Sequence, residues 1–157
     1  SSEVRAKLVR QVVQGAEVRT GDARELSTLG KKYGAILADV PCTGLGALRR
    51  RPEVRWRRTV TDLKALVILQ GEIIDAAIEN LLPGGVLGYA TCSPHLSETR
   101  IAISEALKRH PDVELVDLTS FIHAELRTSA VDRGALTLWT HRHNTDAMFL
   151  SVLRKKN

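Results

Sequence analysis

The sequence has few residues of the types that crosslink a protein or anchor it in a membrane. Its 157 residues include only two cysteines, Cys42 and Cys92, whose separation fits neither a disulfide framework nor a zinc site. Aromatic residues make up 4% of the chain, and no apolar run approaches the roughly 20 residues of a membrane helix. The charged first ten residues do not resemble a secretory signal. We therefore expect a cytoplasmic protein that binds neither a membrane nor a metal ion.

The composition is that of one soluble domain with an excess of positive charge. Hydrophobic residues make up 43% of the chain and charged residues 26%, which is a globular balance. The net charge is +5 and the pI is ≈ 9.6. A basic protein of this kind suits a polyanionic partner, most often a nucleic acid.

The apolar periodicity predicts alternating helices and strands. Helices are predicted for residues 2–13, 63–81 and 97–109. Strands are predicted for residues 16–20, 34–40, 86–90 and 113–118, with residues 135–139 and 147–153 as an antiparallel pair. Thr61 or Asp62 is expected near the N-cap of the second helix, which the turn at residues 83–85 stops. Residues 47–62 and 120–134 are expected to be irregular. The alternation is typical of one α/β domain, residues 1–157, with a mostly parallel sheet.

Both cysteines follow directly after a predicted strand. Cys42 stands in "ILADVPCTG" and Cys92 in "GYATCSP". Ligands of parallel sheets bind at the carboxyl ends of the strands, where Asp39 also lies, and Asp22 follows the first short strand. Cysteine is also a common filler of protein cores, and aspartate is common in turns, so each residue has a structural alternative.

These motifs identify a resemblance to a known enzyme family. "DVPCTGLGALRRRPEVRW", followed one long helix later by "LLPGGVLGYATCS", resembles the Sun (Fmu or RsmB-like) family of RNA 5-methylcytosine methyltransferases. "TGDARELS" and "LWTHRHNTDAMFLSVLRK" are similar to further segments of that family, so the resemblance covers nearly the whole chain. It implies a class I methyltransferase (Rossmann-like) fold with antiparallel C-terminal strands. It also implies methylation of carbon 5 of cytosine in RNA, with S-adenosylmethionine as cofactor and ribosomal RNA as the expected substrate.

The resemblance further implies a role for each of the residues at the strand ends. Cys92 is the nucleophile that adds to carbon 6, so that carbon 5 can take the methyl group. Cys42 then helps to release the product. Asp39 holds the base while charge develops on it. Asp22 contacts the adenine side of the cofactor, and Asp39 and Pro41 are also expected in the cofactor site.

A cluster of arginines follows Cys42. Arginine forks suit phosphates, and an aromatic face can stack on an unpaired base. We predict RNA contacts for six residues, namely Arg49, Arg50, Arg51, Arg55, Arg57 and Arg58. The alternative is a solvated loop whose Trp56 packs under the domain.

The match to the family begins inside the helix that follows its second strand. No segment resembles the family's glycine-rich cofactor loop, "APGGKT": residues 44–46 follow the wrong strand, and residues 83–85 precede a strand instead of following one. We therefore expect this chain to be the C-terminal part of a larger catalytic domain, inactive alone and poor at binding the cofactor. In the family's fold, the first two strands, which this chain lacks, lie between residues 16–20 and residues 34–40. Their absence would leave a gap of roughly 14 Å between the two segments. Residues 34–40 would then form an exposed sheet edge, so we expect either dimerisation through this edge or a rearranged N-terminal segment.

Two other functions fit parts of the sequence. Enzymes that methylate carbon 5 of cytosine in DNA also use a "PC" cysteine, but they need no second cysteine in "TCS". A non-catalytic RNA-binding or assembly domain could keep the fold alone. The presence of Cys42, Cys92 and Asp39 together favours the RNA methyltransferase.

Overall fold

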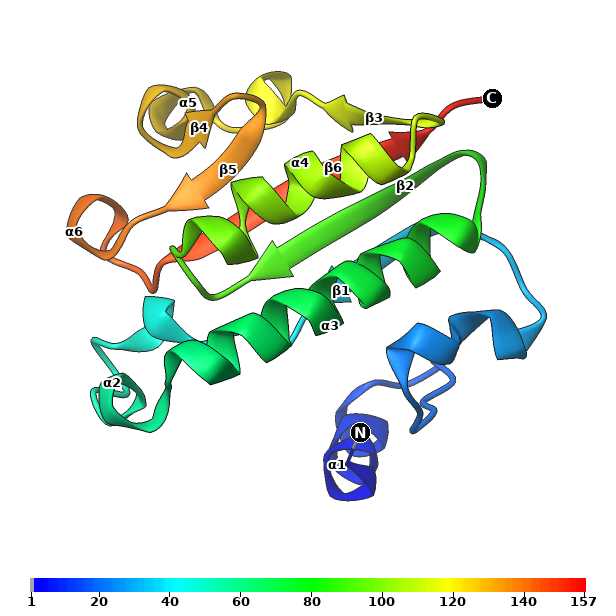
Figure 1. Ribbon diagram of the computed structural model, residues 1–157, viewed down its shortest axis with the longest axis horizontal. Helices are drawn as coiled ribbons and strands as arrows, with labels where there is room; N and C mark the ends of the chain where they lie inside the picture. Colours follow the sequence, from blue (N-terminus) through cyan, green and yellow to red (C-terminus); the bar gives the residue numbers. More distant parts are fainter. Residues whose placement is uncertain (1) are drawn as a thin grey trace.

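A six-stranded mixed sheet forms the centre of the computed structural model, which describes residues 2–157 (Figure 1). The strands are β1 (Tyr33–Asp39), β2 (Leu81–Thr91), β3 (Val113–Val116), β4 (Val131–Asp132), β5 (Ala135–Leu138) and β6 (Met148–Lys155). Their order is β1-β2-β6-β5-β4, and β3 also pairs with β6. β1 and β2 are parallel, whereas β6 is antiparallel to β2, β3 and β5. It follows that β1, β2, β3 and β5 share one direction and β6 runs against them, which confirms the predicted α/β class.

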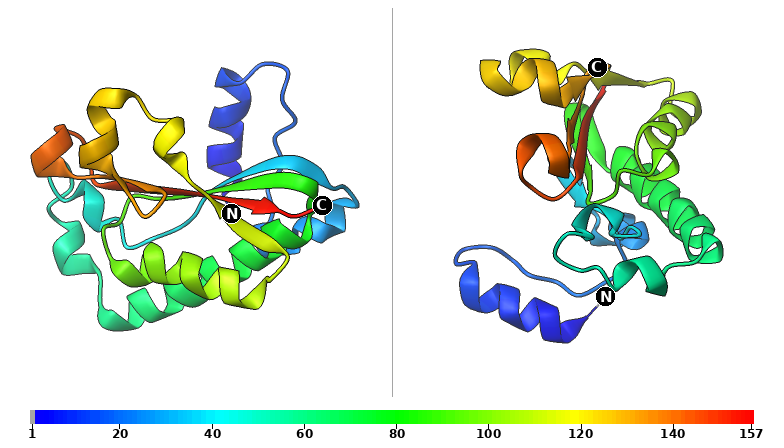
Figure 2. Two further views of the ribbon diagram at one scale, coloured as in Figure 1. Left: turned by 90° about the horizontal axis from the view of Figure 1, so that it is seen from above. Right: turned by 90° about the vertical axis from the view of Figure 1, so that its left-hand side faces the viewer.

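Helices flank the sheet. They are α1 (Glu3–Val12), α2 (Val54–Arg57), α3 (Val60–Glu79), α4 (Arg100–Arg109), α5 (Ala124–Ala130) and α6 (Thr140–His143). Short 3₁₀ turns are η1 (Ala23–Leu29), η2 (Leu45–Ala47), η3 (Leu96–Glu98) and η4 (Leu118–Ser120). α3 and α4 lie side by side on one face of the sheet, and α1 lies on the opposite side near the β1 edge (Figure 2). No helix in residues 2–157 is both long and apolar enough to cross a membrane.

The hydrophobic core lies between this helical face and the middle of the sheet. Ile74 and Ile78 of α3 are buried in one cluster with Leu87 of β2 and Leu153 of β6. Burial of each such side chain contributes about 1.5–3 kcal/mol. The core therefore fixes β2 and β6 against α3. β1 pairs in parallel with β2, so the loops that follow these two strands and contain Cys42 and Cys92 begin at the same end of the sheet.

The start and end of α3 differ from the prediction. Its N-cap is Thr59, two or three residues before the predicted cap, because the Thr59 Oγ1 accepts from the Asp62 N–H (3.2 Å). The Asp62 carboxylate in turn accepts from the Thr59 N–H (2.8 Å), which makes a reciprocal capping box. The helix ends at Glu79, and Leu81 already belongs to β2. β2 therefore includes residues 83–85, which were predicted as a turn.

Three other segments also differ from the prediction. The predicted strand at residues 16–20 is wrong: within the described chain it pairs with no strand, and the Arg10 side chain of α1 donates to the Val18 carbonyl (3.2 Å). Residues 120–134 contain α5 and β4, whose short lengths and polar sequence give little periodicity. Residues 47–62 contain α2 and the start of α3.

Candidate active site at the carboxyl ends of β1 and β2

The two cysteines meet at the carboxyl ends of β1 and β2. These strands are parallel neighbours, with Asp39 opposite Ala90 in the register. The loops after them therefore leave the sheet side by side. The Sγ atoms of Cys42 and Cys92 are 3.3 Å apart, which is hydrogen-bonding distance for two thiols. Cys42 is 9% exposed and Cys92 is half-buried, so Cys92 is the sulfur that a substrate can reach more easily.

A cavity of ≈ 630 Å³ opens at this edge, within the ordinary size range of small-molecule sites. Its lining includes Asp39, Pro41, Cys42 and Cys92, so the structure brings together four of the predicted site residues. A carboxylate next to two thiols can accept hydrogen bonds from a substrate while one thiol acts as a nucleophile. The cavity therefore holds a nucleophile and a hydrogen-bond acceptor within reach of one small substrate group.

The contact between the two sulfurs gives Cys42 and Cys92 different pKa values. A hydrogen bond from the Cys42 thiol to a Cys92 thiolate lowers the pKa of Cys92 to about 7. The same hydrogen bond, together with burial, raises the pKa of Cys42 well above its ordinary value. Because the thiolate is the nucleophilic form, Cys92 is the sulfur prepared to attack at neutral pH.

The pH dependence of alkylation at Cys92 tests this difference in pKa directly. We expect its alkylation by iodoacetamide to rise with a midpoint near pH 7, because only the deprotonated sulfur reacts. In Cys42→Ala the midpoint should move up towards about 8.5, the value of an ordinary thiol. Peptide mapping by mass spectrometry across a pH series measures both. Faster alkylation of Cys42 than of Cys92 would contradict the assignment.

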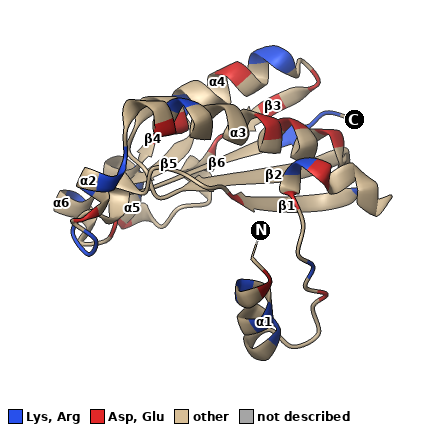
Figure 3. Ribbon diagram, turned by 60° about the horizontal axis from the view of Figure 1, so that its bottom comes forward, with Lys and Arg blue, Asp and Glu red and all other residues tan. Residues whose placement is uncertain are grey.

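Positive charge surrounds the cavity. Of the six predicted arginines, Arg50, Arg51 and Arg58 line it, and Arg5 of α1 joins them. Arg50 is paired with Asp146, a residue just before β6 that also lines the cavity. Figure 3 shows basic residues on the chain around α2, at the cysteine end of the sheet. A polyanionic substrate would therefore meet three cationic side chains that have no carboxylate partner within the described residues.

The other three predicted arginines do not line the cavity. Arg49 contacts the Asn144 side chain (3.5 Å), and Arg55 lies 5.6 Å from the Trp56 ring centroid. Arg57 is exposed at the end of α2. Trp56 is 83% exposed, so the alternative in which it packs under the domain is wrong. These residues form a basic surface next to the cavity, and RNA contact by them stays a prediction.

Asp22 lies apart from the cysteines. It caps η1, where its carboxylate accepts from the Arg24 N–H (3.0 Å). The Arg24 guanidinium also pairs with Asp22 (2.7 Å) and with Glu72 of α3 (2.9 Å), and it lowers the pKa of Asp22 to about 2. Asp22 does not line the cysteine cavity. Contact with a cofactor therefore stays a prediction for this residue.

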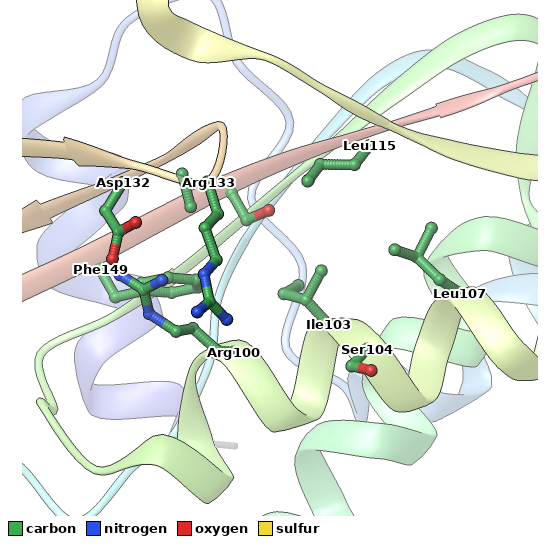
Figure 4. Close-up of a pocket in the computed structure, with 10 residues that line it drawn as sticks. Arg100, Ile103, Ser104, Leu107, Leu115, Asp132, Arg133 and Phe149 are labelled. Atoms are coloured by element: carbon green, nitrogen blue, oxygen red, sulfur yellow. Dashed lines mark ion pairs between the residues drawn. The ribbon is translucent and has the colours of Figure 1, made fainter.

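A second cavity lies between α4 and the sheet (Figure 4). It measures ≈ 220 Å³ and is largely apolar, with Ile103, Leu107 and Phe149 in its lining. An ion pair between Arg100 and Asp132 (2.6 Å) also borders it. Its lining contains no cysteine or histidine, so it lacks the nucleophile of the first cavity. Nor do residues 2–157 contain a group of three side chains placed to hold a metal ion.

The sequence alone does not predict several residues that shape the cysteine site. Arg5, Asp146 and Met148 line the cavity, although they are remote in sequence from both cysteines. Glu98 lies fully buried beneath the two cysteine loops. A charged residue in "HLSETR" gives no sign that it will be buried, because the surrounding residues are polar.

Comparison with known proteins gives the family of this chain. A family model described as "16S rRNA methyltransferase RsmB/F" matches residues 1–154. The chain belongs to the RsmB/F family. The predicted family is thereby confirmed, and the two cysteine motifs are the part of the sequence that carried the prediction.

Relatives and solved structures agree with this family. The chain is 47% identical to MT1451 of Mycobacterium tuberculosis, over 96% of this chain and 33% of that protein. It is 42% identical to "Ribosomal RNA small subunit methyltransferase B" of Vibrio cholerae, over 73% of this chain and 28% of that protein. The crystal structure of NSun6 from Pyrococcus horikoshii with SFG superposes with a TM-score of 0.82 and 30% identity, covering 99% of this chain and 40% of that one. The chain thus spans about a third of the length of its curated RsmB/F relatives.

Proposed function

We propose that this chain is the thiol-bearing part of an S-adenosylmethionine-dependent methyltransferase that modifies carbon 5 of cytosine in ribosomal RNA. The distance of 3.3 Å between the Cys42 and Cys92 sulfurs, at the carboxyl ends of two parallel strands, carries the proposal. Two free thiols at one substrate-sized cavity suit a reaction in which a covalent bond is first made and then broken. Reduced thiols also suit a cytoplasmic location.

The residues of this chain account for the covalent steps. The Cys92 thiolate adds to carbon 6 of the base, and the electron pair of the double bond moves towards carbon 5, which becomes nucleophilic. Asp39 accepts hydrogen bonds from the base and holds it during the attack. After carbon 5 has been methylated, a base takes its proton, the electron pair forms the double bond between carbons 5 and 6 again, and the bond to the Cys92 sulfur breaks so that Cys92 leaves as a thiolate. Cys42 helps this release, since its thiol lies against the departing sulfur.

This chain supplies only part of a cofactor site. S-adenosylmethionine, when bound, supplies the electrophilic methyl group. Asp39 and Pro41 border the cysteine cavity and can form one wall of its site, whereas Asp22 lies elsewhere. Within residues 2–157, Gly44 caps only the three-residue 3₁₀ helix η2 and Gly84 lies inside β2, so neither begins an α-helix after a strand as a phosphate- or nucleoside-binding glycine loop does. We infer that the chain alone binds the cofactor weakly and is inactive.

The arginines that line the cavity support an RNA substrate. Arg5, Arg51 and Arg58 stand at the cavity, so that they can hold phosphates while the target base enters. The base must leave its stack to reach Cys92, either in a loop or by flipping out. Methyl transfer from radiolabelled S-adenosylmethionine to ribosomal RNA by the full-length protein tests the proposal. RNA binding without transfer would support a non-catalytic domain instead, and methylation of DNA but not RNA would support the DNA enzyme.

The exposed β1 edge leads to a prediction about the chain on its own. Within the described residues 2–157, β1 pairs only with β2, and Leu37 of β1 is 73% exposed. We propose that two copies of this chain associate through β1, because an apolar edge strand has unpaired backbone groups. Light scattering coupled to size exclusion should show a dimer that Leu37→Lys weakens, whereas Leu115→Lys, an exposed change away from β1, should not. A monomer at all accessible concentrations would contradict this proposal.

A further inference from the structure

A buried carboxylate lies beneath the two cysteine loops. Glu98, in η3, has an exposed fraction of 0%. Its Oε1 accepts hydrogen bonds from the Thr43 backbone N–H (2.8 Å) and from Gln70 Nε2 (3.0 Å). Its Oε2 accepts from the Thr43 hydroxyl (2.5 Å) and from the Ser93 hydroxyl (2.6 Å). Both carboxylate oxygens are therefore saturated by four donors.

Two of these partners are the residues directly after the two cysteines. Thr43 follows Cys42 after β1, and Ser93 follows Cys92 after β2. The two hydroxyls are 3.2 Å apart and converge on the same oxygen of Glu98. A single carboxylate thus joins the two loops one residue away from the sulfur pair, and the loops have no freedom to separate while these bonds last.

Glu98 and the loops that it connects are also hydrogen-bonded to core residues. Gln70 of α3 donates a second hydrogen bond to the Pro41 carbonyl (2.9 Å), just before Cys42. The Tyr89 hydroxyl of β2 donates to the Glu98 backbone carbonyl (2.8 Å). Gln70 and Tyr89 are both fully buried. The position of the carboxylate is therefore set by α3 and β2, the same elements that support the cavity.

Stability alone does not explain a glutamate at this position. Burying a carboxylate has a large desolvation cost, and hydrogen bonds or ion pairs only offset it. None of the ion pairs in residues 2–157 includes Glu98. An apolar side chain could fill the same space, but it could not bind both loops. The hydrogen-bonding pattern points to a requirement that the loops after β1 and β2, and with them the two cysteines, keep a fixed position relative to each other.

We propose that Glu98 is a positioning residue that holds the Cys42 and Cys92 sulfurs in contact. Its effect on turnover rests on the proposed methyltransferase function, whereas its effect on the thiols does not. Without the carboxylate, the Thr43 and Ser93 loops lose their common acceptor and the sulfurs move apart. Cys92 then loses the hydrogen bond that favours its thiolate form.

The thiols of this chain, without RNA or cofactor, supply the first test. Iodoacetamide alkylation reports the thiolate form of Cys92. Diamide reports sulfur contact: the two thiols give up two protons and two electrons to the azo group, which becomes a hydrazine, and one S–S bond forms. Both reactions are measured in the wild-type chain, Glu98→Ala and Glu98→Gln. Glu105→Gln, which removes an exposed carboxylate on α4, is the matched control.

We expect Glu98→Ala to lower both the neutral-pH alkylation rate and the rate of disulfide formation by roughly tenfold or more, because the thiol returns towards its ordinary pKa. Glu98→Gln should stay within about threefold of the wild type, since its amide oxygen still accepts and its NH₂ group can donate to the hydroxyls. Unchanged thiol rates in a folded Glu98→Ala would overturn the proposal. If Glu98→Ala does not fold, Ser93→Ala and Thr43→Val each remove one hydrogen bond to Glu98 together with the contact between the two hydroxyls, and unchanged rates in both would overturn the proposal equally.

Turnover by the full-length protein supplies the second test. Glu98→Ala should lose about 100-fold in kcat, in line with the effect of small misplacements of reacting groups, and Glu98→Gln should recover most of it. A wild-type protein without methyl transfer would refute the proposed function but leave the thiol result standing. Normal turnover by Glu98→Ala with altered thiols would confirm that Glu98 positions the sulfurs, but would refute the effect of that positioning on turnover.

Discussion

Replacing Cys42 with alanine in the full-length protein is expected to accumulate a covalent adduct between the protein and its RNA. Cys92 can still add to carbon 6 of the base, but the thiol that lies 3.3 Å from its sulfur and helps release is gone. Adduct should form in the presence of S-adenosylmethionine and survive denaturing gel electrophoresis. Methylated product should fall by at least about 100-fold, as is usual when a group acting on a covalent intermediate is removed.

A second variant distinguishes the roles of the two sulfurs. Adding Cys92→Ala to Cys42→Ala should abolish the adduct, because no nucleophile remains at the cavity. Cys92→Ala alone should form neither adduct nor product. An adduct that persists without Cys92 but disappears without Cys42 would reverse the two assignments. The conservative change Cys42→Ser replaces the thiol by a hydroxyl that can still donate a hydrogen bond, and should accumulate less adduct than Cys42→Ala.

Replacing Gly46 with alanine is expected to disrupt both the fold and the cysteine site. A Cβ on Gly46 would lie 2.1 Å from the Ala147 carbonyl oxygen and 2.7 Å from the Cys92 carbonyl oxygen. Both neighbours are backbone atoms, which cannot rotate away. The Gly46 N–H donates to the Cys92 carbonyl (2.9 Å), and its own carbonyl accepts from the Ala147 N–H (3.0 Å). The clash therefore acts on the loop after β2 and on the start of β6 together.

The predicted cost of Gly46→Ala is about 2–3 kcal/mol in the free energy of unfolding, the range of overpacked cores. Urea denaturation followed by circular dichroism measures it. Gly34→Ala is the control, because a Cβ there has no heavy atom within 4 Å and should change stability by less than about 0.5 kcal/mol. Equal stability of the two variants would show that the three segments do not pack as closely as described.

The parts of the fold that follow from repeating sequence patterns could be predicted. α3, α4 and the strands β1 and β6 carry regular apolar patterns, so they were found at nearly their observed positions, whereas only residues 86–90 of β2 were predicted as a strand. Cys42 and Cys92 were expected at one edge of the sheet because both follow such strands. That expectation needed only strand order and direction, which the apolar pattern and the family motifs together supply.

The remaining features depend on contacts between distant residues. Glu98 is bound by Thr43 and Gln70, which are 55 and 28 residues away. Its burial therefore follows from the assembled fold rather than from the local pattern. The strand expected at residues 16–20 has the right composition but no neighbouring strand in the described chain, and strands form only when their backbone groups are paired. Short elements such as α5 have too few turns for a periodic signal.

The placement of α1 has a consequence for how the cavity is charged. Only Ala6 of this helix is buried, and the helix is tied by Arg10 to the extended residues 16–20. α1 therefore contributes little buried surface to the domain, and it brings Arg5 to the cavity from outside the sheet. A protease cut in the segment between α1 and β1 would take one cation from the mouth of the cavity and leave the sulfur pair in place.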